Sequence, residues 1–189
     1  MHFFQIVVGF AAAVSAIDLQ WHYGQNCGGN YIVCVGAEPN VCCGGGTAES
    51  LLFRYIPSSW RIECRGYTGG RCSNRASTIY SAGATSICMR SGGGFFTGAG
   101  YGFVSRKRAL DADETCTDAE LELAADAQPQ KCKSTQDPDT LVLVDGSEYN
   151  LVGVEADKLN RLVCLTIAAD PNVTSASDIP EEFKSLEVV

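Results

Sequence analysis

Ten cysteines constrain the fold of this 189-residue chain more than any other feature of its sequence. All of them lie beyond residue 16, and an even number of cysteines in an exported chain is typical of a disulfide framework. Disulfides form and persist in oxidising compartments, where they add to the stability that a hydrophobic core supplies. We therefore expect all ten to be disulfide-bonded: Cys27, Cys34, Cys42, Cys43, Cys64, Cys72, Cys88, Cys116, Cys132 and Cys164.

The first 16 residues indicate the compartment. MHFFQIVVGFAAAVSA is apolar and ends in small residues, which is typical of a secretory signal peptide cleaved after Ala16. A membrane anchor needs about 20 apolar residues, whereas Asp18 and Gln20 follow at once. We expect a secreted, extracellular protein with no transmembrane segment.

Metal ligation by these cysteines is disfavoured. The chain has no C-x-x-C pair, and His22 is the single histidine after the leader, so zinc-finger spacings are absent. We expect no metal and no cofactor.

The adjacent pair Cys42 and Cys43 is hard to close on itself, so each should bridge to a different partner.

Glycine usage and charge both change near residue 105. Seventeen of the twenty glycines lie between Gly24 and Gly102. Residues 17–108 carry nine Lys or Arg and four acids, a net charge of +5, whereas residues 109–189 carry five and eighteen, a net of −13. Such asymmetry indicates segments that attract one another or face different partners.

The chain is therefore divided into a signal peptide (1–16), a basic Gly/Cys-rich β segment (17–105), a polar junction (106–116) and an acidic α+β segment docked on the first (117–189). The junction carries the dibasic pair Lys107-Arg108, a candidate processing site for kexin-like proteases. Seven cysteines precede Arg108 and three follow it, so full pairing within one chain requires at least one disulfide across the junction.

The first segment indicates short strands, because runs rich in β-branched and aromatic residues alternate with Gly, Pro, Asn and Ser. A short helix capped by Thr47 is the alternative for TAESLLFRYI. The predicted strands are 31–35, 51–56, 60–64, 78–80, 85–89 and 94–96.

The acidic segment mixes strand and helix patterns. Capping-box spacing from Thr117 to Glu120 predicts a helix over 118–127. Asp145-Gly146 between two strand-like runs predicts a hairpin with a two-residue turn. RLVCLTIAAD predicts a strand, and DIPEEFKSL a short helix from Asp178. The expected fold class is mainly β (α+β), a small disulfide-braced antiparallel structure with one hairpin and one or two short helices.

Most catalytic chemistries lack their residues here. His22 alone would have to serve any nucleophile as base, and no G-x-S-x-G elbow accompanies it. The glycine-rich stretches do not match a phosphate loop. A glycoside hydrolase needs only two carboxylates, and the second segment offers many, so that alternative stays open. Asp111, Asp113 and Glu114 are interpreted as a solvated loop.

A surface for a polysaccharide or an anionic ligand is the main binding hypothesis, with core packing as its alternative. Arginines interleaved with aromatic residues suit such ligands, and the candidates are Trp60, Arg61, Arg65 and Tyr67. Nucleic acid is disfavoured as a partner by the acidic net charge. Asn172-Val-Thr is an acceptor sequon that predicts N-glycosylation of Asn172.

The leader, the C-x6-C-x7-C-C spacing at Cys27, Cys34, Cys42 and Cys43, and the dibasic pair together resemble small secreted cysteine-rich proteins of filamentous fungi. That group includes effectors, wall proteins and killer-type toxins. The resemblance implies a non-enzymatic secreted binding protein, an effector or toxin acting on a host or competitor surface. A secreted carboxylate-dependent glycoside hydrolase and a structural cell-wall protein are the alternatives. Neither the disulfide connectivity nor the oligomeric state follows from the sequence.

Overall fold

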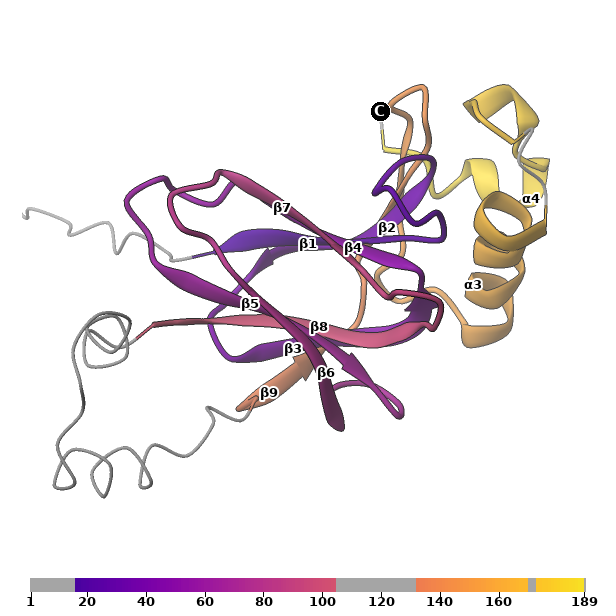
Figure 1. Ribbon diagram of the computed structural model, residues 1–189. Coiled ribbons are helices and arrows are strands. Elements are labelled where there is room, and N and C mark those ends of the chain that lie inside the picture. Colours follow the sequence, from indigo (N-terminus) through magenta and orange to yellow (C-terminus); the bar gives the residue numbers. More distant parts are fainter. Residues whose placement is uncertain (1–15, 105–131, 170–172, 189) are drawn as a thin grey trace, which may run out of the picture.

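Two β-sheets form the body of the protein in a computed structural model, which describes residues 16–104, 132–169 and 173–188 (Figure 1). The six-stranded sheet has the order β11-β10-β2-β1-β4-β7, and the five-stranded sheet has the order β6-β5-β8-β3-β9. The strands are β1 (Ile17–His22), β2 (Tyr31–Ala37), β3 (Val41–Ala48), β4 (Ser50–Arg54), β5 (Ile62–Thr68), β6 (Asn74–Tyr80), β7 (Ser86–Arg90), β8 (Phe96–Phe103), β9 (Ser134–Gln136), β10 (Thr140–Val142) and β11 (Glu148–Asn150).

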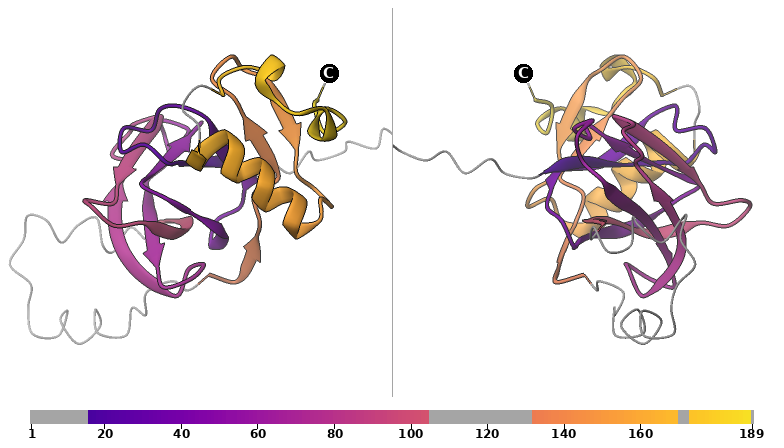
Figure 2. Two further views of the ribbon diagram at one scale, coloured as in Figure 1. Left: turned by 90° about the vertical axis from the view of Figure 1, so that its right-hand side faces the viewer. Right: turned by 60° about the vertical axis from the view of Figure 1, so that its left-hand side comes forward.

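Helical turns follow the last strand and lie at one end of the two sheets (Figure 1). They are α3 (Ala156–Val163), the π-helical turn η1 (Cys164–Ala169), the 3-10 turn η2 (Ala176–Asp178) and α4 (Glu181–Lys184). Figure 2 shows α3 lying across that end, beside the hairpin of β10 and β11. The fold is therefore mainly β with short helices in its C-terminal part, as predicted.

The inner faces of both sheets pack into one core. Trp21 of β1, Phe53 of β4 and Tyr101 of β8 are fully buried in it. Leu141 of β10 and Leu162 of α3 belong to the same cluster. The sequence left open whether the two segments share a core, and these contacts show that they do.

The pairing of strands also joins the two segments. β10 extends the six-stranded sheet by pairing with β2 in antiparallel fashion. β9 extends the five-stranded sheet by pairing with β3, and this ladder is parallel, with Cys42 opposite Thr135. The acidic segment thus completes an edge of each sheet.

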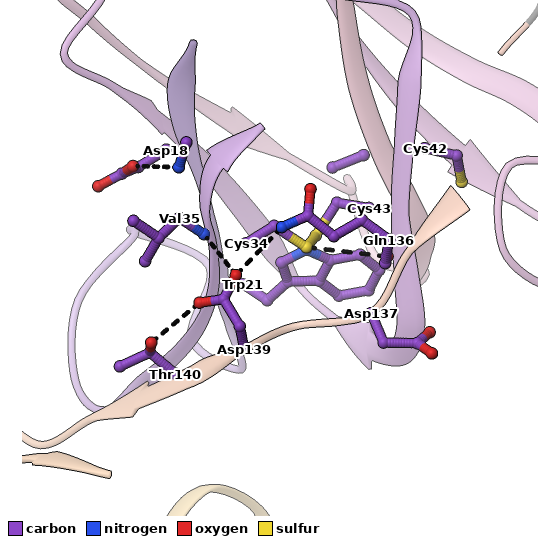
Figure 3. Close-up of a disulfide and its surroundings, with 12 residues drawn as sticks. Asp18, Trp21, Cys34, Val35, Cys42, Cys43, Gln136, Asp137, Asp139 and Thr140 are labelled. Carbon is purple, nitrogen blue, oxygen red and sulfur yellow. Dashed lines mark hydrogen bonds between the residues drawn. A yellow bond between two sulfur atoms is a disulfide. The ribbon is translucent and has the colours of Figure 1, made fainter. Parts of the chain in front are cut away.

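Three disulfides brace the described residues, and all three lie within the basic segment: Cys27–Cys88, Cys34–Cys43 and Cys42–Cys72. Neighbouring strand residues point to opposite faces, so Cys43 reaches inward to β2 of the other sheet while Cys42 points outward (Figure 3). The Trp21 indole lies against the inner bridge and donates its N–H to Cys43 Sγ at 3.2 Å. The adjacent cysteines therefore have different partners, as predicted.

The prediction that every cysteine is paired is wrong for three of them. Cys64, Cys132 and Cys164 are free thiols, and Cys116 lies outside the described residues. None of the described disulfides crosses the junction, so the crossing bridge required by full pairing is not formed among them. Cys64 is fully buried between the sheets in a cluster of apolar side chains, and no disulfide joins it to any other described cysteine.

Two local predictions also need correction. The hairpin of β10 and β11 forms, but Leu143 N–H donates to Ser147 O at 2.9 Å and Gly146 N–H donates to Leu143 O at 3.0 Å. The loop is therefore three residues long, with Gly146 at φ 92° in its last position, a geometry in which glycine forms a bulge. RLVCLTIAAD was predicted as a strand, but its residues 161–169 form the end of α3 and η1.

Candidate functional site

The predicted surface of Trp60, Arg61, Arg65 and Tyr67 does not assemble. Arg65 is fully buried, and Tyr67 is almost so. Trp60 is half-buried against the core, with its ring packed edge-on against Phe103 at 5.0 Å between centroids. Only Arg61 is exposed, so the alternative of core packing describes these residues better than a binding surface does.

Arg65 is buried on the outer face of β5, where it belongs to a network of charged and polar side chains. Its Nε donates to Glu63 Oε1 at 2.8 Å, and its Nη1 donates to Asn40 Oδ1 at 3.0 Å. Arg75 of the edge strand β6 approaches the same carboxylate at 3.5 Å. A buried charge is tolerated only when it is paired and hydrogen-bonded, so this arginine has a structural role.

His22, which would have to be the base for any nucleophile, also has a structural role. It is buried in β1, where its Nδ1 lies 3.2 Å from Gly28 O and its ring packs against Tyr31. Burial, opposed by the hydrogen bond with Gly28 O and assisted by the nearby charge of Arg54, lowers the pKa of His22 to about 4. The imidazole is therefore neutral at physiological pH, and its ring is held by contacts with Gly28 and Tyr31.

A groove of about 460 Å³ lies between α3 and the second half of β3, and we call it the α3 groove. Its size is in the range of small-ligand sites, which are usually apolar with a few placed polar groups. Apolar side chains from four parts of the chain make up much of its lining: Ile32, Pro138, Leu151, Ala156, Leu159 and Val163. Gly45, Gly46 and Thr47 of β3 complete one wall.

Five residues with polar side chains line the groove: Tyr23, Thr47, Arg71, Asp137 and Asn160. Arg71 and Asp137 form an ion pair of 2.8 Å, and about half of each side chain or more is exposed to solvent. Gly45 approaches this pair closely, since a Cβ at its position would lie 3.1 Å from Asp137 Oδ1. The groove thus has an apolar wall and a polar rim.

The α3 groove was not predicted from the sequence, because the end of α3, which forms one wall of the groove, was predicted to be a strand. Leu159, Leu162 and Val163 recur at positions i, i+3 and i+4, which is the period of a helix. The run of Leu, Val, Cys and Ile that follows concealed this period and resembled a strand. Leu162 faces the core while Leu159, Asn160 and Val163 face the groove.

Three sulfur atoms form a second cluster, close to the groove. The Sγ atoms of Cys42, Cys72 and Cys132 all lie within 4.8 Å of one another. A soft metal ion prefers thiolate ligands, but two of these sulfurs are joined in a disulfide. The cluster could bind a metal only after that bond is reduced.

Several predicted sites fall outside the described residues: the dibasic pair Lys107-Arg108, the sequon residue Asn172, Cys116, the helix over 118–127 and the acids Asp111, Asp113 and Glu114. In the part of the chain that the structure covers, none of the helices has the length and apolar character needed to cross a membrane.

Comparison with known proteins places the chain in a family. The model of the ARB_05566_N family, which describes an N-terminal domain, matches residues 18–140. The chain belongs to this family. The matched part of this ARB_05566_N member runs from β1 to the start of β10, so it includes the five-stranded sheet, the strands β1, β2, β4 and β7 of the six-stranded sheet, and the three described disulfides.

The chain is also similar to an uncharacterized secreted protein of Arthroderma benhamiae (strain ATCC MYA-4681 / CBS 112371). The two are 24% identical over 192 residues, which cover 96% of this chain and 90% of that protein. No solved structure matches. The predicted resemblance to secreted proteins of filamentous fungi is confirmed, and this ARB_05566_N member is a secreted, disulfide-rich protein.

Proposed function

We propose that this secreted protein is a non-enzymatic binding protein, an effector or toxin that holds a carbohydrate of a host or competitor surface in the α3 groove. The α3 groove itself is the observation that carries the proposal. Its volume of about 460 Å³ and its apolar wall with a polar rim have the character of a small-ligand site.

Carbohydrate fits this lining better than a purely apolar or purely charged ligand does. A sugar ring presents C–H faces, which pack on apolar and aromatic side chains, and hydroxyl groups, which need hydrogen-bonding partners when they leave water. Tyr23 and Leu159 offer the first kind of contact. Arg71, Asp137 and Asn160 offer donors and acceptors for the second.

Binding without hydrolysis is supported by the number of acids. A glycoside hydrolase uses two carboxylates about 5–10 Å apart. Among the described residues that line the α3 groove, Asp137 is the single carboxylate, and it is paired with Arg71. We therefore favour a binding role over the hydrolase alternative.

The test is saturable binding of the purified, exported protein to insoluble chitin, β-1,3-glucan and cellulose, measured by depletion from solution. Asn160→Ala removes a polar partner, and Ala156→Phe fills the groove from the exposed start of α3. We expect both variants to lose most of the binding. Arg90→Ala, an exposed arginine on β7 that does not line the groove, is the matched control and should bind like the wild type.

Trp60→Ala separates this site from the surface that the sequence predicted. Because Trp60 packs on Phe103 and does not line the groove, a folded Trp60→Ala variant should retain binding. The proposal is wrong if no polysaccharide is bound, or if Asn160→Ala and Ala156→Phe bind as well as Arg90→Ala. Co-fractionation with wall material without saturation would instead favour a structural wall protein.

A further inference from the structure

The three-sulfur cluster combines a disulfide with a free thiol at close range. Cys42 and Cys72 are bonded, Cys132 is free and half-buried, and their Sγ atoms all lie within 4.8 Å of one another. The three residues come from β3, from the turn between β5 and β6, and from the chain just before β9. A cysteine that could pair with either of two bonded partners is the starting arrangement for thiol–disulfide exchange.

Glycines on the outer face of β8 make room for this cluster. A Cβ at Gly98 would lie 2.7 Å from Cys72 Sγ, and a Cβ at Gly100 would lie 3.9 Å from Cys132 Sγ. These glycines are two residues apart, so they share one face of the strand. Any side chain at Gly98 would collide first with the backbone carbonyl of Arg71 and then with Cys72 Sγ, so the turn that carries Cys72 packs directly against β8.

We propose that Cys42, Cys72 and Cys132 form a thiol–disulfide exchange site. The Cys132 thiolate attacks Cys42 Sγ, a Cys42–Cys132 bond forms as the Cys42–Cys72 bond breaks, and Cys72 leaves as a thiolate. Cys72 then takes up the proton that Cys132 released. One disulfide and one thiol are present before and after the step, so neither an oxidant nor a reductant is needed.

The anchoring of the three residues favours Cys42 as the sulfur that is attacked. Cys42 is the second residue of β3 and is held by strand pairing, because the strand that follows Cys132 pairs directly with β3 and places Thr135 opposite Cys42. Cys72 lies in a turn whose neighbours Gly70, Arg71 and Ser73 are exposed. The turn can therefore move away with the leaving thiolate while β3 and β9 keep their places.

Exchange has two structural consequences. The new bond would join the basic segment to the acidic segment covalently, which the described disulfides do not. It would also release the turn that carries Arg71, whose ion pair with Asp137 lies at the rim of the α3 groove. The exchange chemistry itself does not depend on the proposed binding function.

The other two described free thiols provide internal comparisons. Cys64 is fully buried, and burial raises its pKa to about 12, so this thiol is inert in the folded protein. Cys164 is exposed but lies outside the three-sulfur cluster. Accessibility alone would make Cys164 more reactive than the half-buried Cys132, whereas our proposal assigns the exchange to Cys132.

The test is disulfide mapping of the full exported chain by mass spectrometry. The protein is incubated at pH 8 without added thiol, quenched in acid, alkylated and digested without reduction. We expect a Cys42–Cys132 peptide together with alkylated Cys72, beside the Cys42–Cys72 peptide. Cys132→Ser should lose the first species completely, and the matched control Cys164→Ser should retain it.

A second variant keeps the proposal testable if the equilibrium between the two disulfides strongly favours Cys42–Cys72 in the wild type. Cys72→Ser removes the competing partner, and in the oxidising secretory pathway we expect it to be exported with a Cys42–Cys132 bond. Wild type with Cys42–Cys72 alone, combined with Cys72→Ser in which Cys42 and Cys132 are both alkylated, would overturn the proposal. A bond from Cys132 to Cys116 or Cys164 in the wild type would overturn it as well.

Discussion

Single residues in this protein show that polar character does not place a side chain on the surface. On the strand from Ile62 to Thr68, Glu63 and Arg65 are both buried on the outer face of the sheet. Their carboxylate and guanidinium groups form an ion pair of 2.5 Å and are further held by Asn40 and Arg75. Arg65, which was expected to bind an external anionic ligand, therefore binds the carboxylate of Glu63 inside the protein.

Removal of this buried guanidinium should be strongly destabilising. Arg65→Met leaves the buried Glu63 carboxylate with Arg75 as its only described cationic partner, and breaking a buried ion pair typically costs about 3–5 kcal/mol. Arg61→Met, on the exposed residue just before the same strand, should change stability by less than about 0.5 kcal/mol. Urea unfolding at pH 7 measures both, and equal midpoints for the two variants would show that the pair contributes nothing.

His22 predicts how stability depends on pH. Its folded pKa of about 4 lies below the ordinary histidine pKa of 6.5, so between these pH values the unfolded chain binds more protons. Stability is therefore full above about pH 6.5 and falls as the pH drops toward 4, by up to about 3 kcal/mol. The same pH series on His22→Gln isolates this contribution, because the carboxylates titrate in both proteins. Identical pH profiles for wild type and variant would contradict the assignment.

At the scale of elements, glycines decide how closely parts of the fold approach. Gly146 ends the loop of the β10–β11 hairpin at a positive φ. Gly66 of β5 has a different role, since a Cβ at its position would lie 2.5 Å from the Phe96 ring and 2.8 Å from Met89 Sδ. Phe96 lies on β8 and Met89 on β7 of the opposite sheet. The spacing of the two sheets thus depends on the absence of one methyl group.

Gly66→Ala should therefore overpack the core. We expect a loss of about 1–3 kcal/mol of stability, because added volume in a packed core forces side chains out of their rotamers. Gly94→Ala is the control, since a Cβ there meets nothing within 4 Å and its φ is not positive. Thermal unfolding of the two variants gives the comparison. A Gly66→Ala protein as stable as Gly94→Ala would mean that Phe96 and Met89 can move aside.

At the scale of the whole molecule, the acidic segment is held by sheet pairing, core packing and side-chain hydrogen bonds. β9 and β10 each extend one sheet, and Leu141 and Leu162 lie in the common core. The amide of Asn30 also donates to Thr166 O at 2.6 Å and to Val173 O at 2.7 Å. The opposite charges of the two segments, evident from the sequence, accompany this association.

Cleavage after Arg108 tests how the segments are joined. We expect the nicked protein to elute as one species in native gel filtration, because the paired strands and the core remain intact. In SDS without reductant, the two pieces should separate in every molecule that carries Cys42–Cys72. The fraction that stays linked should equal the exchanged fraction found by disulfide mapping, and it should be absent from Cys132→Ser. Pieces that stay fully linked in Cys132→Ser would show another covalent bond across the junction.

The sequence by itself determined the secreted character, the mainly β class, the positions of β2, β4 and β7, and the different partners of Cys42 and Cys43, whereas it missed β1 and β3 and located only parts of β5, β6 and β8. These follow from local patterns: a leader, short β-rich runs between glycines, and the geometry of adjacent cysteines. Only the tertiary structure decided that Arg65 is buried, that Cys64 has no disulfide partner among the described residues, that residues 161–169 are helical, and that a groove lies between α3 and β3. Each of these depends on which distant residues come together, and no local pattern specifies that.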